Sequence, residues 1–508
     1  MEFLRNSNPE RLNNNNGEIR CQIVDWISYN ETPEIDEDDD KYSDNSKYII
    51  QIFGIDEKGQ SISIRVKNFK PRFFINIPKS WEDNQIQIFI NHLKDNVKKR
   101  YKNSIHSHKV LRRHKFRGFT NFEKFKFIKL TFHNTHALNQ YVNILKKKQM
   151  IPALSRCKKK YDLYESNIEP FIRFIHIQNI SPSGWIKVLK KKYDLIYPYK
   201  TNCQNEIETY WKNVENYERS DIGPMIVASF DIECDSSHGD FPLAKKGYKK
   251  LANEIIDNIQ KKRKKYEEDK SNFNELFENK EKQEEKIWEL LNMGFSDKPN
   301  NEDISFLFTK NRQKYNKKEL KEVIDKIVYI SFSKINKLGN YKELKVAVEE
   351  TLRIWGSQSL EILDTIAYDM GKKHEISKDK ILRRIIKRDI LVEKLTGIFD
   401  NYLPPLEGDK IIQIGTTVNK YGDDTCYLKH IVTLNTCNPI EGAEVVPCDK
   451  EEDVIKEWFK FIKKLDPDII TGYNIFGFDF KFIYERAEEL DIIFELGTLG
   501  RMKERELK

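Results

Sequence analysis

The sequence predicts a multidomain protein that combines the α/β and α+β fold classes, and three observations support this prediction. First, 508 residues exceed what one hydrophobic core usually organises. Second, residues 19–155 alternate strand-like and helical patterns, as in a compact α+β unit. Third, the uncharged run 225–230, typical of a buried strand, leads directly into Asp231 and Glu233, and Lys/Glu-rich helical patterns follow over residues 245–400.

Composition restricts the classes of function. Charged residues make up 33% of the chain, and no apolar run reaches the roughly 18 residues of a membrane span. The seven cysteines are scattered without a C-x-x-C pair, which favours reduced thiols and argues against a zinc site. We therefore expect a cytoplasmic or nuclear location, or a viral replication site, with neither secretion nor a membrane partner. The net charge of +8 permits a polyanionic partner without requiring one.

The first 47 residues form a polar segment that we expect to be partly disordered. It contains the asparagine run 13–16, a strand candidate over residues 19–28 and the acidic run 34–40, which we interpret as a solvated loop.

Residues 48–220 are predicted to form an N-terminal α+β domain. Alternating patterns predict strands over 48–55, 61–66, 69–78 and 125–132, with a hairpin turn at Lys58 and Gly59 and helices over 81–99 and 136–148. Further strand-like segments follow at 164–178 and at Gly184 and Trp185. The most basic stretch of this domain, residues 98–117, includes Tyr101 and Phe116; it is either a nucleic-acid surface or a solvated loop.

Residues 245–404 are predicted to be a large helical insertion that ends at Pro404 and Pro405. An insertion of this size is tolerated if its two ends lie close together. Lys and Glu at helical spacing predict helices over 251–270, 273–291, 318–330, 346–355 and 377–400.

β character resumes at Lys410. Two strand-like runs flank Tyr421, Gly422, Asp423 and Asp424, which we interpret as a hairpin turn because Gly-Asp is ordinary turn chemistry. A Y-G-D sequence with a second Asp also resembles the metal-binding turn of nucleic-acid polymerases, but its surroundings do not.

Asp231 and Glu233 are candidate metal ligands. Residues two apart in a strand project to the same face, so the two carboxylates are expected side by side at one end of a sheet. Two buried like charges are costly unless cations neutralise them, and Mg²⁺ or Mn²⁺ prefers oxygen ligands.

A second carboxylate stretch follows the predicted helix 453–464. Residues 468–473 are predicted to be a strand, 474–477 a turn, and Phe478 onward a helix. Asp479 therefore lies at a strand-to-helix junction, where helix N-terminal amides and a carboxylate can both face a ligand. Asn474 supplies an amide that can donate to a phosphate.

Together these residues resemble the family B DNA polymerases. F-D-I-E at residues 230–233 resembles their first exonuclease motif, and Asn474, Phe478 and Asp479 in N-I-F-G-F-D match the second. G-Y-N-I-F-G-F-D-F-K-F-I-Y-E-R-A resembles the delta-like replicative branch, and the likeness covers residues 48–244 and 405–508. The resemblance implies an RNase H-like exonuclease domain built from residues 221–244 and 405–508.

The resemblance also implies roles for these residues. In the family, the acids that match Asp231, Glu233 and Asp479 hold two divalent ions, Mg²⁺ or Mn²⁺, around the terminal phosphodiester. One ion lowers the pKa of the attacking water and the other stabilises the departing 3′ oxygen. Asn474 and Phe478 would position the frayed single strand. The implied partners are DNA, at the primer 3′ end, the polymerase half in cis or in trans, and a sliding clamp.

Two departures from the family pattern stand out. The family's third motif, Y-x-x-x-D, is absent from the 29 residues after Asp479, where Tyr484 and Glu488 are predicted to be helix surface. The polymerase palm, fingers and thumb are also missing from these residues. The exonuclease fold is thus expected to be C-terminally incomplete, and the chain inactive by itself.

Our leading interpretation is the N-terminal and proofreading 3′→5′ exonuclease portion of a replicative DNA-directed DNA polymerase, truncated or split before the polymerase domain. The alternative is a non-catalytic DNA-binding or assembly subunit that pairs with a separate polymerase chain. A stand-alone exonuclease is the third interpretation. The Lys, Asn and Ile bias and the large insertion suit a large DNA virus.

Overall fold

The computed structural model describes residues 5, 12, 17–32, 44–116, 118–236, 241–268, 279–296, 304–305, 307, 309, 315–335, 378–496 and 499–503. The predictions for residues 13–16, 34–40 and 346–355 lie outside them. The chain forms two compact units, the first made of Met1–Asp231, Ile414–Ile475 and Phe494–Lys508, the second of Ile232–Gln413 and Phe476–Ile493. Several sheets and helices give the mixed α/β architecture that the sequence predicts.

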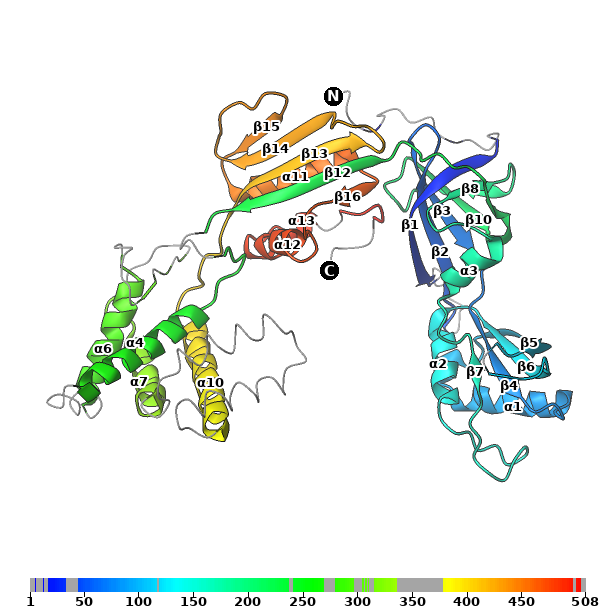
Figure 1. Cartoon of the computed structure of the whole chain (residues 1–508), viewed down its shortest axis with the longest axis horizontal. Helices are drawn as coiled ribbons and strands as arrows, with labels where there is room; N and C mark the ends of the chain where they lie inside the picture. The colour runs from blue at the N-terminus through cyan, green and yellow to red at the C-terminus, as the bar shows by residue number, and fades with distance from the viewer. Residues whose placement is uncertain are drawn as a thin grey trace. The chain divides into compact units, whose positions relative to one another are not determined.

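A seven-stranded sheet organises the N-terminal part of the first unit (Figure 1). The predicted hairpin between β2 and β3 is confirmed, and its turn places Gly59 at φ +77°, a conformation that favours glycine. The strand order is β11-β8-β1-β2-β3-β10-β9, with β1 (Ile19–Glu31), β2 (Lys47–Ile55), β3 (Ser61–Lys67), β8 (Trp185–Val188), β9 (Tyr193–Leu195), β10 (Asn205–Tyr210), the 3₁₀ turn η2 (Trp211–Asn213) and β11 (Val214–Asn216).

Helix α3 (Pro170–Gln178) packs Phe174 and Ile175 into the core of this sheet. The prediction of strand-like structure here is wrong. Pro170 occupies the first helical turn after Glu169, where its missing N–H group is not needed, and this signal outweighs the apolar run that follows.

A four-stranded sheet follows in the first unit, so residues 19–155 contribute to two sheets within one compact unit. Helices α1 and α2 cover one face of it with a shared apolar core. The order is β5-β6-β4-β7, built from β4 (Arg72–Ile77), α1 (Asp83–Asn96), the 3₁₀ turn η1 (Lys99–Tyr101), β5 (Ile105–His114), β6 (Lys124–Phe132), α2 (Thr135–Leu145) and β7 (Leu163–Tyr164).

The third sheet, most of which belongs to the first unit, carries the candidate acids. Its order is β15-β14-β13-β12-β16, with β12 (Ile226–Cys234), β13 (Ile411–Lys420), β14 (Leu428–Leu434), β15 (Glu444–Cys448) and β16 (Ile469–Thr471). Helix α11 (Glu451–Leu465) packs on the sheet, with the Trp458 ring 4.7 Å from that of Phe230. The Trp458 indole N–H also donates to Thr416 at 3.1 Å.

The segment between β13 and β14 is the hairpin turn that the sequence predicts. Gly422 has φ +94°, and the amide of Asp423 donates to the carbonyl of Lys420 at 3.1 Å. Asp423 and Asp424 are both exposed.

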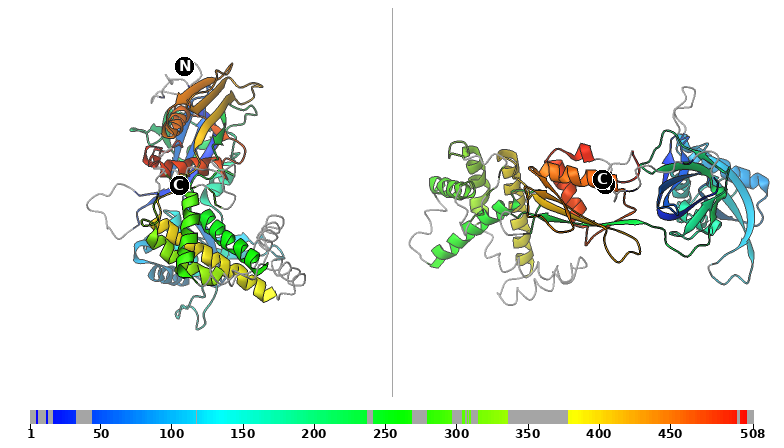
Figure 2. Two further views of the ribbon diagram at one scale, coloured as in Figure 1. Left: turned by 90° about the vertical axis from the view of Figure 1, so that its left-hand side faces the viewer. Right: turned by 90° about the horizontal axis from the view of Figure 1, so that it is seen from above.

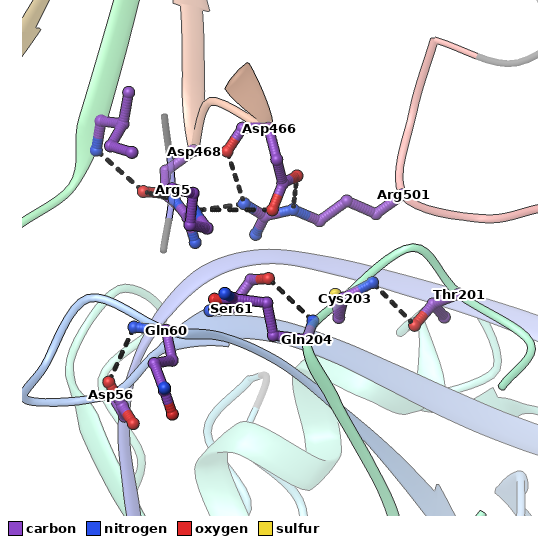
Figure 3. Close-up of polar contacts among 11 residues, drawn as sticks. Arg5, Asp56, Gln60, Ser61, Thr201, Cys203, Gln204, Asp466, Asp468 and Arg501 are labelled. Carbon is purple, nitrogen blue, oxygen red and sulfur yellow. Dashed lines mark hydrogen bonds and ion pairs between the residues drawn. The ribbon is translucent and has the colours of Figure 1, made fainter. Parts of the chain in front are cut away.

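Two arginines neutralise a pair of acids immediately before β16 (Figure 3). Arg501 donates to Asp466 at 3.0 Å and to Asp468 at 2.8 Å, and Arg5 forms ion pairs with the same two acids. The Asp468 side chain is fully buried and also accepts from the amide of Ile226 at 2.8 Å. Residues from both ends of the sequence therefore fix the start of β16 against the start of β12.

The second unit contains a group of helices, α4 (Lys249–Glu268), α6 (Lys280–Gly294), α7 (Lys321–Ile335) and α10 (Lys378–Tyr402), that lie side by side (Figure 2). They share one core, to which Ile255, Leu290, Ile327 and Leu395 contribute. The predicted helices over 251–270, 318–330 and 377–400 are confirmed. The one over 273–291 is described from residue 279 onward. No helix in the described part of the chain is long and apolar enough to cross a membrane.

The two ends of this helical segment lie side by side. The amide of Asp409 donates to the carbonyl of Leu243 at 2.8 Å, and the amide of Leu243 donates to the Asp409 carboxylate at 2.9 Å. Lys246 also pairs with that carboxylate. The chain thus leaves and re-enters the same region, which is the condition for tolerating a long inserted segment. The remaining helices are α12 (Asp479–Glu489) and α13 (Ile493–Leu496).

Candidate acidic site on strand β12

Asp231 and Glu233 are exposed on β12 and alternate with Phe230 and Ile232, which are 3% and 5% exposed. The alternation confirms that the two carboxylates share one face of the strand. Since Phe230 packs against Trp458 of α11, the acids belong to the face turned away from that helix. In the described part of the chain, no basic side chain pairs with either acid. Both charges are solvated, so the burial penalty expected from the sequence does not apply.

Asp479 is the first residue of α12 and is only 1% exposed. Its Oδ1 accepts a hydrogen bond from the amide of Ile232 at 3.2 Å. Ile232 separates Asp231 from Glu233 in the sequence, so Asp479 is fastened to the strand segment that carries the acids. The sequence predicts the strand-to-helix junction correctly, but not that this carboxylate is buried and bound to backbone.

Gly472 follows β16 and lies against β12. A Cβ atom added here would be 2.5 Å from the carbonyl oxygen of Phe230 and 2.4 Å from the side chain of Ile475. Only glycine therefore allows the chain to pass this close to the residue that precedes Asp231.

Asn474 lies in the predicted turn after β16 and is exposed. Its φ of +55° is a left-handed conformation, which asparagine tolerates better than most residues. Tyr473 and Phe476 on either side are 93% and 84% exposed. The sequence patterns singled out neither aromatic residue, although Phe476 stands inside N-I-F-G-F-D and Tyr473 directly precedes it.

Phe478 is half-buried and directly precedes α12. Its ring contacts those of Phe241 and Phe482, each with centroids 5.3 Å apart. Phe241 is 74% exposed and Phe482 only 3%, so Phe241 and the half-buried Phe478 offer an aromatic surface beside the start of α12. Phe241 lies in a D-F-P sequence at residues 240–242, eight residues after F-D-I-E, and this short match to the same family is the only signal for it in the sequence.

Arg486 fixes the position of α12 in the second unit. It is 1% exposed, donates to the carbonyl of Ala244 at 3.1 Å and pairs with Glu489 at 3.1 Å. Glu489 in turn accepts from the amide of Gly408 at 3.0 Å. A Cβ at Gly408 would be 1.9 Å from the Ala244 carbonyl oxygen, so glycine is required. No local pattern in the sequence predicted this network.

Tyr484 and Glu488 lie in α12, and Glu488 pairs with Lys245 at 2.5 Å. The hydrogen bond from Lys245 holds the pKa of Glu488 below its ordinary value. The prediction that this pair lies in a helix, at its surface, is confirmed.

Asp231 and Glu233 form a candidate site for a divalent metal ion. Carboxylate oxygens are the ligands that Mg²⁺ and Mn²⁺ prefer, so the chemistry of Asp231 and Glu233 is suitable. Among the described residues, however, no three His, Cys, Asp or Glu side chains are grouped closely enough to hold a metal. The carboxylates of Asp231 and Glu233 are thus suitable ligands for Mg²⁺ or Mn²⁺. The described residues do not bring a third such side chain close enough to complete a metal site.

These features define a multi-sheet α/β protein with an acidic strand end beside a strand-to-helix junction. Residues 161–348 and 358–508 match the family model for "DNA polymerase family B, exonuclease domain", which covers more than half of the chain. The chain belongs to family B of the DNA polymerases, through its exonuclease region.

Viral enzymes are among its relatives. The chain is 35% identical over 479 residues to a DNA polymerase of Pyramimonas orientalis virus, covering 92% of this chain and 36% of the relative. It is 29% identical to a DNA polymerase of Phaeocystis pouchetii virus, covering 89% and 44%. A 120-residue stretch is 43% identical to the DNA polymerase delta catalytic subunit of Dictyostelium discoideum, covering 24% and 10%. The chain thus spans less than half the length of these relatives.

Proposed function

We propose that this chain provides the proofreading 3′→5′ exonuclease portion of a replicative DNA-directed DNA polymerase, and that it hydrolyses 3′-terminal nucleotides in support of DNA synthesis. The observation that carries the proposal is the exposed acid pair of β12, with Asp479 bound to the amide between the two acids. An acid pair with no basic partner among the described residues is available to cations from solution.

In this proposal Asp231 and Glu233 hold Mg²⁺ or Mn²⁺ through their exposed carboxylates, and Asp479 completes the acidic set. Two divalent cations held there would activate the attacking water and stabilise the leaving 3′ oxygen. The Asp479 hydrogen bond to Ile232 fixes the start of α12 relative to the strand that carries the acids. The exposed amide of Asn474 would donate to a phosphate, and Phe478 with Phe241 would stack on unpaired bases.

The same proposal assigns the parts of the chain. Residues 1–47 are the polar N-terminal segment and 48–220 the N-terminal domain. Residues 221–244 and 405–508 form an RNase H-like exonuclease domain, and 245–404 are an inserted helical segment. The hydrogen bonds between Leu243 and Asp409, which join the two ends of that segment, support its interpretation as an insertion.

The absence of a three-acid group among the described residues favours a second candidate, a non-catalytic DNA-binding or assembly subunit that works with a separate polymerase chain. In such a subunit Asp231, Glu233 and Asp479 would have no catalytic role. DNA would still be the partner.

The test is release of labelled mononucleotide from 3′-labelled single-stranded DNA by the whole chain with Mg²⁺ or Mn²⁺, alone and with a polymerase-domain chain in trans. Activity in either condition that Asp231→Ala abolishes would support the exonuclease. The double variant D423N/D424N, which removes an exposed acid pair of the β13–β14 turn, is the matched control and should retain activity. DNA binding without cleavage in both conditions would contradict the exonuclease and support the binding subunit.

A further inference from the structure

The hairpin formed by β5 and β6 concentrates positive charge. Residues 105–132 contain one acidic residue, Glu123, and eight lysines and arginines: Lys109, Arg112, Arg113, Lys115, Arg117, Lys124, Lys126 and Lys129. Glu123 is already paired with Lys79. Within the described residues, none of the basic side chains of β5 or β6 forms an ion pair. The hairpin therefore presents cations without internal counter-charges.

The register of the hairpin sets like charges against each other. Lys109 lies directly opposite Lys129, and Arg112 lies opposite Lys126. Like charges directly opposite on neighbouring strands destabilise the pairing, so a bound polyanion would relieve a repulsion that the fold itself leaves in place. Burial lowers the pKa of Lys129, and the nearby charges of Arg72 and Lys109 lower it further.

Aromatic rings share the row of Lys109 and Lys129, whereas Arg112 and Lys126 lie on the other face, in the row of Ile77. Helices α1 and α2 cover one face of the sheet, and the register aligns Lys109, Lys129, Phe74 and Tyr164 across the other. Four residues further along β5, on the same face as Lys109, Arg113 lies opposite Phe125. β5 is the edge strand of this sheet, and no strand in the described part of the chain pairs with its outer side (Figure 1).

The connection between β5 and β6 contains three phenylalanines whose side chains are exposed. Phe116, Phe119 and Phe122 are 107%, 95% and 89% exposed. Exposed rings next to unpaired cations are the combination that single-stranded nucleic acid recognises, because phosphates bind the cations and unpaired bases stack on the rings. Duplex DNA offers the phosphates but keeps its bases stacked internally.

We propose that the β5–β6 hairpin binds single-stranded nucleic acid. Lys109 and Arg113, on the face turned away from α1 and α2, bind the phosphates, and Phe116, Phe119 and Phe122 stack on bases. This surface is built from residues of the N-terminal part of the chain and uses none of the acids on β12. Its function does not depend on the exonuclease, so either proposal can fail alone.

The test measures binding of the whole chain to fluorescein-labelled oligothymidylate and oligouridylate by anisotropy, with EDTA present so that cleavage plays no part. K109Q/R113Q should weaken binding and reduce the slope of log K against log salt by about 1.4, since each phosphate contact on a single strand contributes about 0.7. F116A/F119A/F122A should weaken binding at least about fivefold at every salt concentration and leave the slope unchanged.

The control is K158Q/K159Q, which removes the same charge from an exposed lysine run in the same unit and should bind as the wild type does. Thermal unfolding of each variant checks that it is folded. Tighter binding of either single strand than of a matched duplex supports the proposal. Duplex binding at least as tight, unchanged binding by the hairpin variants, or an equal loss in the control would overturn it.

Discussion

Two acid pairs with the same spacing lie on or directly before neighbouring strands of one sheet. Basic side chains neutralise only one of the two pairs. Asp466 and Asp468 precede β16, and Arg5 and Arg501 neutralise both of them. The exposed pair on β12 has no basic partner in the described part of the chain. The comparison teaches that D-x-D or D-x-E spacing does not define a metal site. The two pairs differ in whether arginine side chains of the described residues neutralise the carboxylates.

The difference follows from burial. The Asp468 side chain is fully buried, and an unneutralised charge there would be very costly. Asp231 and Glu233 remain in water, where their mutual repulsion is weak and a hydrated cation has access. One pair therefore stabilises the fold, and the other is available for chemistry.

The largest effect should come from D468N. This substitution keeps the side-chain shape but leaves Arg5 and Arg501 without the buried carboxylate, which should lower the free energy of unfolding by about 3–5 kcal/mol. Urea denaturation followed by fluorescence measures it. A loss below about 1 kcal/mol would mean that this pair is as solvated as the pair on β12.

A smaller loss is expected for R501A, because Arg5 continues to neutralise Asp466 and Asp468. Loss of the two charged hydrogen bonds from Arg501 should cost about 1.5–3 kcal/mol in the same denaturation experiment. An effect equal to that of D468N would show that Arg5 does not contribute.

The smallest effect is expected for D231N. Because the carboxylate is exposed and makes no contact with a described basic group, the unfolding free energy should stay within about 0.5 kcal/mol of wild type, with a slight gain from reduced repulsion of Glu233. A loss comparable to that of D468N would remove the contrast between the two pairs.

Much of the sheet that carries the acids could be predicted from the sequence, because its signals are local. The uncharged run before Asp231 predicts a strand, and the period of two along a strand predicts that Asp231 and Glu233 share one face. The predicted turn at residues 474–477 locates the strand-to-helix junction before α12. The helices between β12 and β13 follow from Lys and Glu at helical spacing, wherever the structure describes them.

What could not be predicted depends on distant contacts or on mixed patterns. β5 was missed because His106, Lys109 and Arg112 give no apolar alternation, since both faces of this edge strand are exposed. Nothing local relates Arg5 to Asp468, and nothing local shows that Asp479 binds the Ile232 amide. Local sequence patterns determine the order of helices and strands. Whether a charged side chain is buried, paired or exposed depends on residues that are distant in the sequence.

The most direct test of the account is Mn²⁺ binding by the whole chain, followed by electron paramagnetic resonance of the free ion. Wild type should bind Mn²⁺, and D231N/E233Q should lose that binding. D423N/D424N, which removes two exposed charges from the β13–β14 turn, should bind as wild type does. Unchanged Mn²⁺ binding by D231N/E233Q would contradict the claim that the unneutralised pair on β12 is a cation site.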